Sequence, residues 1–225
     1  MNPSFPIGHI LVGAVRPLGD SGKPSAIHKA PVDRPVRATR IGFDADSQAD
    51  QKHHGGLEQA IHHYPFDHYD GWRNEIGPVP VLEKPGAFGE NLSTLGLTER
   101  EVAVGDVFRL GGATLQVSQG RQPCWKLNVR FGVDDMASRV QVSGRSGWYY
   151  RVLEEGDVQP GAVLECIDRV MPEWTVERVW RALYVDRHDV ATLAALAGLH
   201  TLSEGWRRLA GRRAEAIASR DPDSV

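Results

Sequence analysis

The residue best suited to chemistry in this sequence is Cys124, which lies in the segment 120–128 just past the middle of the chain. It is one of only two cysteines, with Arg121 three residues before it and Lys126 two residues after it. A thiol acts as a metal ligand or nucleophile in its thiolate form, which cationic neighbours favour. Pro123 is excluded from helix interiors, so we expect a turn after a strand that presents the thiol. The alternative is a buried cysteine that serves only packing.

Positive charge is concentrated around this thiol. Residues 118–151 contain six Lys or Arg and two Asp, a local charge of +4 in a chain of formal net charge -3. A local basic field suits an anionic ligand that the sulfur also contacts. The alternative is a solvated basic surface, and the coincidence with Cys124 favours the ligand.

Histidines form a second cluster, because five of the nine lie between His53 and His68. A zinc site there, as in a zinc hydrolase, needs His53 or His54, one of His62 or His63, and a carboxylate or Cys124. Adjacent residues on a strand point to opposite faces, so His62 and His63 supply one ligand at most. No HExxH or CxxC spacing supports zinc. Exposed or hydrogen-bonded histidines are the favoured interpretation.

The composition excludes several classes of protein. Hydrophobic residues make up 41% of the chain and charged residues 24%, which is ordinary for a soluble protein and predicts no nucleic-acid or membrane partner. We find no apolar run of about 18 residues and no signal-peptide pattern, so we expect a cytoplasmic location. Two cysteines cannot hold an iron–sulfur cluster by themselves, and Cys166, within an apolar run, is expected to pack in the core. No dinucleotide-binding, phosphate-loop or serine-hydrolase motif occurs.

Short strands dominate the first 170 residues. A Gly-Gly pair at 111–112 between two apolar runs predicts a hairpin, and the helical spacing of apolar residues after Pro65 predicts one amphipathic helix. A short helix is also expected at 134–142. Many short strands with isolated helices argue for a mostly β, barrel-like fold. The predicted strands lie at 7–15, 30–41, 88–92, 107–117, 148–153 and 162–170, with 30–41 as a half-exposed edge strand.

The spacing of hydrophobic residues along the sequence changes after Pro172. Apolar residues then recur at helical spacing in three short segments, with Thr175 and Ser203 as candidate caps and Gly198 as a stop. We therefore predict a barrel-like domain at 1–170, a small three-helix domain at 171–219 and a disordered tail at 220–225. Helix-turn-helix DNA binding is disfavoured, because 171–225 holds eight Arg and eight Asp or Glu rather than a basic face.

Several ordered segments resemble the MOSC domain, and specifically its YiiM type, in which a small three-helix domain follows the MOSC domain. The resemblance covers nearly the whole chain. The segments that carry it are Lys23-Pro24-Ser25-Ala26-Ile27, His54-Gly55-Gly56, Ala60-Ile61-His62-His63-Tyr64-Pro65, Phe88-Gly89-Glu90-Asn91-Leu92-Ser93, Val104-Gly105-Asp106, Gln116-Val117-Ser118-Gln119 and Arg121-Gln122-Pro123-Cys124-Trp125-Lys126-Leu127.

The resemblance implies a barrel-like core that binds the molybdenum cofactor (Mo-molybdopterin), with Cys124 at the position of the metal ligand. Sulfur ligation suits this metal. It also implies a molybdenum-dependent oxidoreductase that reduces small N-hydroxylated compounds such as 6-hydroxylaminopurine and so detoxifies base analogues. Electrons are expected from a separate reductase, and the oligomeric state stays open. The alternative is a non-catalytic module that carries the cofactor or sulfur on Cys124.

Further site residues follow from the resemblance together with donor chemistry. Basic and hydroxyl side chains suit the terminal phosphate of the pterin, and glycines let backbone amides approach it. Three residues, His54, His62 and Glu90, are open candidates for the acid that helps water leave. The expected cofactor contacts are Lys23, Ser25, Gly55, Gly56, Asn91, Ser118, Arg121, Lys126 and Asn128.

Two positions depart from the pattern of the family. Gly120 stands where proline is expected, which loosens the approach to Cys124. Gln59 stands where arginine is expected, which removes a cationic contact for an anion. Gly120 and Gln59 are therefore the positions at which the site of this chain is expected to differ from the family pattern.

Overall fold

The computed structural model describes residues 3–49 and 55–219. The predicted tail at 220–225 and the candidate residue His54 therefore lie outside the described residues. Three short 3-10 helices, η1 (Gly19–Ser21), η2 (Leu57–Gln59) and η3 (Pro80–Glu83), accompany the α-helices. The α-helices are α1 (His68–Ile76), α2 (Lys126–Phe131), α3 (Met136–Ser143), α4 (Val176–Tyr184), α5 (Val190–Gly198) and α6 (Glu204–Ala218).

Strands are short throughout the described part of the chain. They are β1 (Ser4–Pro6), β2 (His9–Val12), β3 (Arg16–Pro17), β4 (Pro24–Ser25), β5 (Ala30–Val32), β6 (Val36–Thr39), β7 (Gly42–Phe43), β8 (Ile61–His63), β9 (Leu92–Ser93), β10 (Val107–Leu110), β11 (Ala113–Gly120), β12 (Trp148–Glu154), β13 (Gly156–Val158) and β14 (Val163–Asp168).

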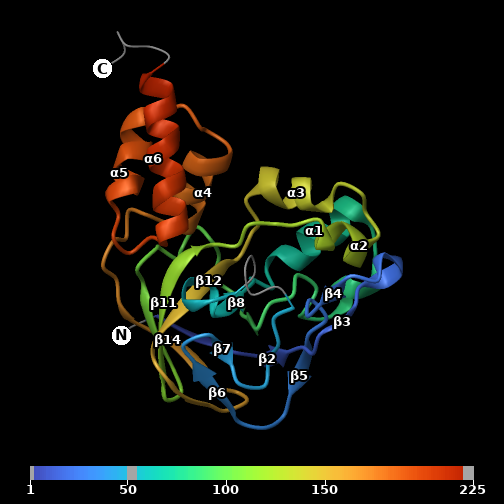
Figure 1. Ribbon diagram of the computed structural model, residues 1–225. Coiled ribbons are helices and arrows are strands. Elements are labelled where there is room, and N and C mark those ends of the chain that lie inside the picture. Colours follow the sequence, from blue (N-terminus) through green and yellow to red (C-terminus); the bar gives the residue numbers. More distant parts are fainter. Residues whose placement is uncertain (1–2, 50–54, 220–225) are drawn as a thin grey trace.

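Nine strands form one mixed sheet in the order β1-β14-β10-β11-β12-β8-β9-β2-β5. The β8–β9 pair is parallel and the remaining neighbours are antiparallel. The sheet curls into a half-barrel, and the strands β13-β6-β7 form a second, smaller sheet beside it (Figure 1). The predicted mostly β, barrel-like core is therefore confirmed.

The clearest prediction of local structure was the hairpin, and it is confirmed. Strands β10 and β11 pair in antiparallel register, with Leu110 opposite Ala113 across the glycine turn. Gly111 has φ +58°, which suits glycine because side chains crowd the backbone in this region. The hairpin leads β11 directly to the segment that carries Cys124.

Other element boundaries differ from the predictions. The predicted edge strand at 30–41 is two strands, β5 and β6, which pair in different sheets, because Pro35 between them has no N–H to donate. The predicted strand at 88–92 is a loop until Leu92, where β9 begins. The helix expected from Pro65 begins at His68, and α2 was not predicted at all.

Three helices, α4 to α6, follow the sheet, as predicted (Figure 1). Thr175 caps α4 by accepting a hydrogen bond from the backbone of Arg178, whereas the side chain of Ser203 makes no such bond at α6. Helix α5 ends at Gly198, as expected. Buried residues of these helices join those of the main sheet in one hydrophobic cluster, so the helices complete the core of the β structure.

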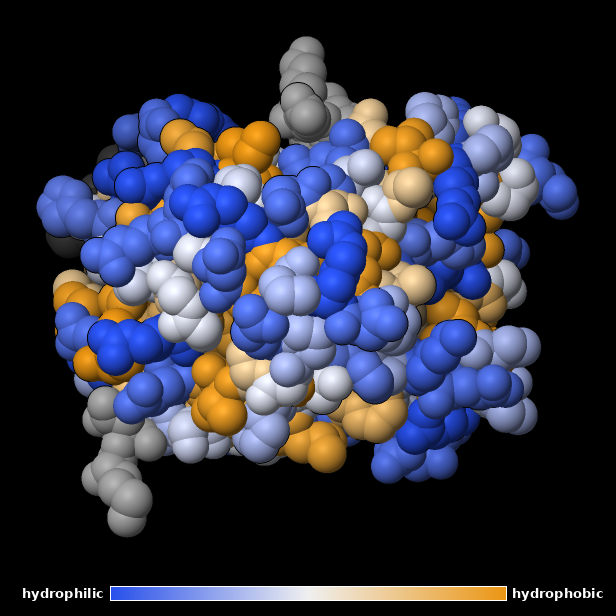
Figure 2. Space-filling view, turned by 90° about the horizontal axis from the view of Figure 1, so that it is seen from below, coloured by the Kyte–Doolittle hydropathy of each residue, from blue (hydrophilic) through white to orange (hydrophobic). Residues whose placement is uncertain are grey.

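A second hydrophobic cluster lies under α1, α2 and α3. It surrounds Phe88, whose ring stacks on Tyr64 with centroids 3.8 Å apart. Both groups of helices lie on the same side of the strands in Figure 1. On the opposite face, shown in Figure 2, hydrophobic residues form separate small patches among hydrophilic ones. None of the helices in the described residues combines the length and apolarity needed to span a bilayer.

Candidate functional site

A cavity that is partly open to solvent lies beside Cys124. Seven of the predicted site residues line it: Ser25, Gly55, His62, Asn91, Arg121, Cys124 and Lys126. They come from segments that are distant in the sequence, between β4 and the start of α2. The fold thus brings the thiol, two cations and several hydrogen-bonding groups to one place.

Cys124 lies between the end of β11 and the start of α2. It is partly exposed, and its carbonyl accepts a hydrogen bond from the backbone of Leu127 at 3.0 Å. The expected turn after a strand is therefore present. Cys166 is buried in β14, as expected for a packing cysteine.

Arg121 is the buried cation of the cavity, with only 5% of its surface exposed. Its backbone N–H donates to the carbonyl of Gly147 at 3.0 Å. Its side-chain atom Nη1 is buried and has no hydrogen-bond partner among the described residues. Buried polar groups are normally paired, so this atom is available to a further partner beyond the residues 3–49 and 55–219.

His62 and His63 lie on β8 and point to opposite faces, as predicted. His62 faces the cavity with a buried Nε2 that has no partner in the described part of the chain. Burial, together with the nearby charge of Arg121, holds the pKa of His62 well below its ordinary value. Because burial disfavours its charged form, the imidazole is neutral near neutral pH.

His63 belongs to the core instead. Its Nδ1 lies 3.0 Å from the hydroxyl of Tyr150 and its Nε2 lies 2.9 Å from that of Thr94. Burial lowers the pKa of His63 to about 3. This histidine is a neutral structural residue with both ring nitrogens paired.

Lys29 and Asp46 line the cavity as an ion pair that was not predicted. Asp46 also accepts hydrogen bonds from the backbone of Gly13 at 2.7 Å and from the side chain of Asn91 at 2.8 Å. The pKa of Lys29 is lowered by burial, against the opposing effect of Asp46. Seventeen residues separate the two partners and neither belongs to a chemical motif, so no sequence signal joins them.

Glu90 lies outside the lining of the cavity and is fully buried. Its carboxylate accepts hydrogen bonds from the backbone of Gly86 at 2.6 Å and Phe88 at 3.0 Å, and from the hydroxyl of Tyr69 at 2.5 Å. Burial raises the pKa of Glu90 and these hydrogen bonds oppose the rise. In this arrangement Glu90 holds the loop that leads to the cavity residue Asn91.

Four other expected cofactor contacts lie away from the lining. Lys23 is exposed with its Nζ 5.0 Å from the ring centroid of Trp125. Ser118 donates to backbone carbonyls of Glu58 and Tyr149. Asn128 accepts from the backbone of Ala137 at 2.8 Å, and Gly56 precedes η2.

The six basic side chains of segment 118–151 do not all lie around the thiol. Arg121 and Lys126 reach the cavity, but the other four cations have different partners. Arg130 donates to carbonyls of residues 86 and 87, Arg139 and Arg145 pair with Glu75, and Arg151 pairs with Glu58. Counting charge along the sequence therefore overstated the positive charge at the site, because three of the six cations are in ion pairs and Arg130 is held by carbonyls.

The zinc interpretation gains no support from the part of the chain that the structure describes. Residues 3–49 and 55–219 contain no group of three or more His, Cys, Asp or Glu side chains arranged to hold a metal ion. His53 and His54 lie outside the described residues. A sulfur-containing, cation-lined cavity is thus the site that the described structure offers.

A curled mixed sheet with this cavity at a strand end, followed by three helices, defines a MOSC-domain protein with a helical extension. The MOSC domain model matches residues 50–165, and the model described as YiiM-like, 3-alpha helix domain, matches residues 174–215. The chain belongs to the MOSC family, in its YiiM type.

Known proteins agree with this assignment. Protein YiiM of Escherichia coli is 42% identical over 196 residues, which cover 85% of this chain and 88% of that protein. The crystal structure of YiiM from Geobacillus stearothermophilus superposes with a TM-score of 0.79 at 32% identity, covering 94% of this chain and 100% of that chain. A Gibberella moniliformis protein named Reductase is 41% identical over 160 residues, covering 71% of this chain and only 28% of its own length.

The two departures from the family pattern have different surroundings. Gln59 lines the cavity, where an amide replaces the expected cation. Gly120 ends β11 and lies against two tryptophans of the C-terminal helices. A Cβ built on Gly120 would lie 2.9 Å from Cη2 of Trp206 and 3.1 Å from Cε3 of Trp180.

Proposed function

We propose that this chain is a molybdenum-cofactor-dependent reductase of small N-hydroxylated compounds, with Cys124 as the protein ligand of the metal. The observation that carries the proposal is the set of groups around one cavity: a partly exposed thiol, and buried nitrogens of Arg121 and His62 that have no partner in the described residues. A large anionic group with sulfur affinity would satisfy all three.

The donor set fits this cofactor. Thiolate is a soft ligand of the kind that such a metal accepts. The cavity also presents the cations Arg121 and Lys126, the hydroxyl of Ser25 and the amide of Asn91, which suit the phosphate and the polar edges of a pterin. The cofactor supplies the two-electron redox chemistry, and the protein binds and orients it.

The reaction needs two protons as well as two electrons. In R–NHOH the N–O bond breaks, the nitrogen leaves as R–NH2, and the oxygen leaves as water. His62 is the one acid candidate of the three that the described structure places on the cavity, and it is neutral because of burial. The neutral ring carries one N–H, so His62 is suited to relay a proton at the substrate, whereas burial disfavours an additional proton on it. Lys29 shares the cavity wall as the ion-pair partner of Asp46.

The electron donor is proposed to be a separate reductase. The chain carries no recognised flavin or nicotinamide motif, and its two cysteines are too few for a cluster. The match to the longer protein named Reductase covers only 28% of that protein, so the reducing function of that protein can involve segments outside the matched part.

Metal analysis tests the proposal most directly. Protein purified from cells that make the cofactor is expected to contain near-stoichiometric molybdenum and to release a pterin on denaturation. Cys124→Ala should lose the metal, whereas Cys166→Ala, which changes a packing cysteine that does not line the cavity, should keep it. Absence of molybdenum from the wild-type protein would exclude the proposal.

Turnover then separates an enzyme from a carrier. With reduced methyl viologen as electron source, the molybdenum-containing protein is expected to convert 6-hydroxylaminopurine to adenine. Metal and pterin bound without turnover would support the carrier instead. Zinc in place of molybdenum, retained in Cys124→Ala, would support a hydrolase.

A further inference from the structure

The end of strand β11 connects the C-terminal helices to the cavity. Gly120 is its last residue and is followed directly by Arg121. The φ of Gly120 does not lie in the left-handed region, so the backbone does not require glycine there. The space for a Cβ is instead filled by Trp206 of α6 and Trp180 of α4. Glycine allows the two indole rings to contact the strand itself.

A main-chain hydrogen bond fixes the same helix to the same strand. The backbone of Ser203, immediately before α6, donates to the carbonyl of Ser118 at 2.9 Å. Trp206 follows within the first turn of α6 and packs against Trp180 with ring centroids 6.0 Å apart. The beginning of α6 is thus held against the last three residues of β11.

A second connection reaches Arg121 by way of α3 and Gly147. The indole N–H of Trp180 donates to the carbonyl of Gln141 in α3 at 2.9 Å. The connection from α3 to β12 then includes Gly147, whose carbonyl accepts from the backbone of Arg121. Helix α4 therefore contacts both segments that border Arg121.

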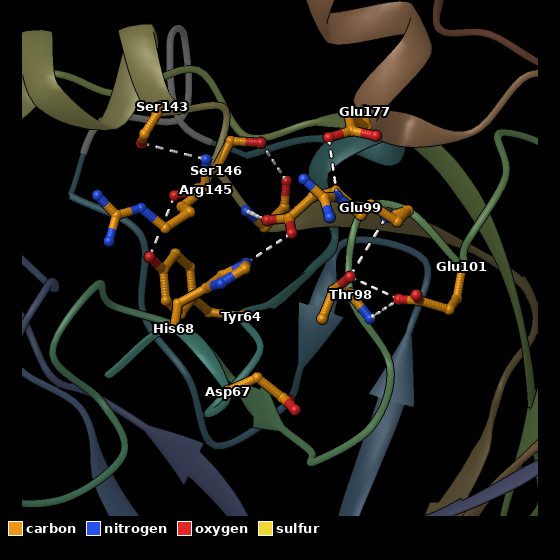
Figure 3. A network of polar contacts seen from close by, with 12 residues as sticks. Tyr64, Asp67, His68, Thr98, Glu99, Glu101, Ser143, Arg145, Ser146 and Glu177 are labelled. Atoms are coloured by element: carbon orange, nitrogen blue, oxygen red, sulfur yellow. Dashed lines mark hydrogen bonds and ion pairs between the residues drawn. The ribbon is translucent and has the colours of Figure 1, made fainter. Parts of the chain in front are cut away.

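The carboxylate of Glu99 strengthens this second connection. It accepts a hydrogen bond from the backbone of Gly147 at 2.6 Å and lies 2.6 Å from Nε2 of His68. The carbonyl of Glu99 accepts from the backbone of Glu177 in α4 at 2.9 Å. Figure 3 shows Glu99 facing His68, with Glu177 beside it. One buried residue thus links α1, α4 and the segment that pairs with Arg121.

We propose that the C-terminal helices position the cavity wall that carries Arg121 and Cys124, with Trp206 as the principal positioning residue. Both connections end at Arg121, one through Gly120 and the other through Gly147. Arg121 is buried, and its guanidinium hydrogen-bonds Tyr149, while its Nη1 lacks a partner in the described residues. The side chain is therefore only partly held by its own contacts, and contacts made by the neighbouring backbone add to the order of this segment.

A purely structural role for the helices makes a different prediction. If they only cover the hydrophobic core, changes at Trp206 should lower global stability without a preferential effect on residues 119–125. If they position the cavity wall, amide hydrogen exchange should rise there first, because local opening can occur well below the free energy of global unfolding. The inference concerns the polypeptide alone, so it can fail or hold whatever ligand the cavity takes.

The test uses the cofactor-free full chain and the variant Gly120→Ala. The added methyl group collides with Cη2 of Trp206, so we expect about tenfold faster amide exchange in 119–125 and in 144–147. The hairpin residues 107–117 should be unchanged under the same native conditions. Alkylation of Cys124 by iodoacetamide, located by peptide mass spectrometry, should change in rate as well.

Rescue and control variants isolate the contact. Trp206→Phe removes the nearer of the two indole atoms that the new methyl group meets and leaves Cε3 of Trp180 at 3.1 Å. Gly120→Ala/Trp206→Phe should therefore return exchange in 119–125 most of the way to the level of Trp206→Phe alone. Gly205→Ala, on the same helix, adds a methyl group with no atom within 4 Å and should leave exchange unchanged.

Two results would overturn the inference. One is wild-type exchange in 119–125 and wild-type alkylation of Cys124 in Gly120→Ala. The other is failure of Trp206→Phe to relieve the effect. If Gly120→Ala does not fold, Trp206→Phe alone decides: it should accelerate exchange in 119–125 and 144–147 more than in 107–117, and uniform acceleration would contradict the proposal.

Discussion

The ammonium group of Lys29 and the carboxylate of Asp46 form an ion pair in the cavity wall, with only 8% and 6% of their side chains exposed. Removing two charges from water is costly, and here the pKa of Lys29 is lowered because burial outweighs the attraction of Asp46. Asp46 has two further donors, Gly13 and Asn91. The carboxylate is thus the centre of a polar network that supports one side of the site.

Removing one partner of this ion pair is expected to destabilise the protein more than replacing both partners. Asp46→Ala leaves the ammonium of Lys29 buried and unpaired, and should lower the free energy of unfolding by about 3–5 kcal/mol. Lys29→Met/Asp46→Leu should be less destabilised than Asp46→Ala, because no buried charge is left behind. Urea denaturation of the three proteins measures the difference. A double variant less stable than Asp46→Ala would contradict this prediction, because the unpaired ammonium of Lys29 would then not be the larger cost.

Stability should fall in mild acid because His63 must remain neutral. Its pKa is about 3 in the folded protein, against 6.5 as its ordinary value, so between these values the unfolded chain binds a proton that the folded chain does not. The contribution of His63 to stability is fully present above its pKa in the unfolded chain. It declines as the pH falls toward its pKa in the folded protein. From about pH 8 to about pH 5 the expected loss is about 2 kcal/mol.

Two variants assign that pH dependence to His63. In His63→Gln the side chain does not titrate. The loss of unfolding free energy from about pH 8 to about pH 5 should therefore be smaller than in the wild type by about 2 kcal/mol. Thr94→Val removes a hydrogen-bonding partner at Nε2 but keeps the imidazole, so it should lower stability at every pH and retain the slope. An unchanged slope in His63→Gln, measured by urea denaturation, would assign the effect to other groups.

Arg121 should favour ligand binding at the expense of stability. Its buried Nη1 has no partner in the described part of the chain, and an unsatisfied buried donor is costly. Arg121→Met should therefore raise the free energy of unfolding of the cofactor-free protein by about 1–3 kcal/mol. The same variant should lose molybdenum on purification, while Arg121→Lys should bring no gain in stability. A less stable Arg121→Met would mean that unseen contacts already satisfy the guanidinium.

Local signals predicted the fold better than they predicted strand pairing. The hairpin was predictable because Gly111 and Gly112 separate two apolar runs, and α4 because its apolar spacing follows a recognisable cap. The segment 30–41 was predicted as one strand because its alternating polarity continues across the turn between β5 and β6. Helix α2 was missed although Gly132 closes it with φ +66°, since a helix of six residues is too short to show a period.

The site was predictable where its chemistry is carried by single residues. Cys124, Arg121 and His62 line the cavity as expected, because reactive types with suggestive neighbours can be recognised one at a time. Lys29 and Asp46 were missed, since their pairing depends on a tertiary contact across 17 residues. Charge counting failed for the same reason: Arg151 is neutralised by Glu58, which lies 93 residues away in the sequence.

Gly147 should be the glycine of the site that tolerates substitution least. It has φ +66°, and a Cβ there would lie 2.3 Å from the carbonyl oxygen of His63 and 3.1 Å from Nε2 of His62. Gly147→Ala therefore combines left-handed strain of about 1–2 kcal/mol with a collision against backbone that cannot move without displacing β8. Gly161→Ala is the matched control, because its φ is +78° and nothing lies within 4 Å of the added atom. We expect Gly147→Ala to lower the free energy of unfolding by at least about 2 kcal/mol more than Gly161→Ala, and to lower molybdenum retention as well, since Gly147 also holds Arg121. Equal losses in the two variants would show that the backbone around His63 yields, and that His62 is not fixed by this contact.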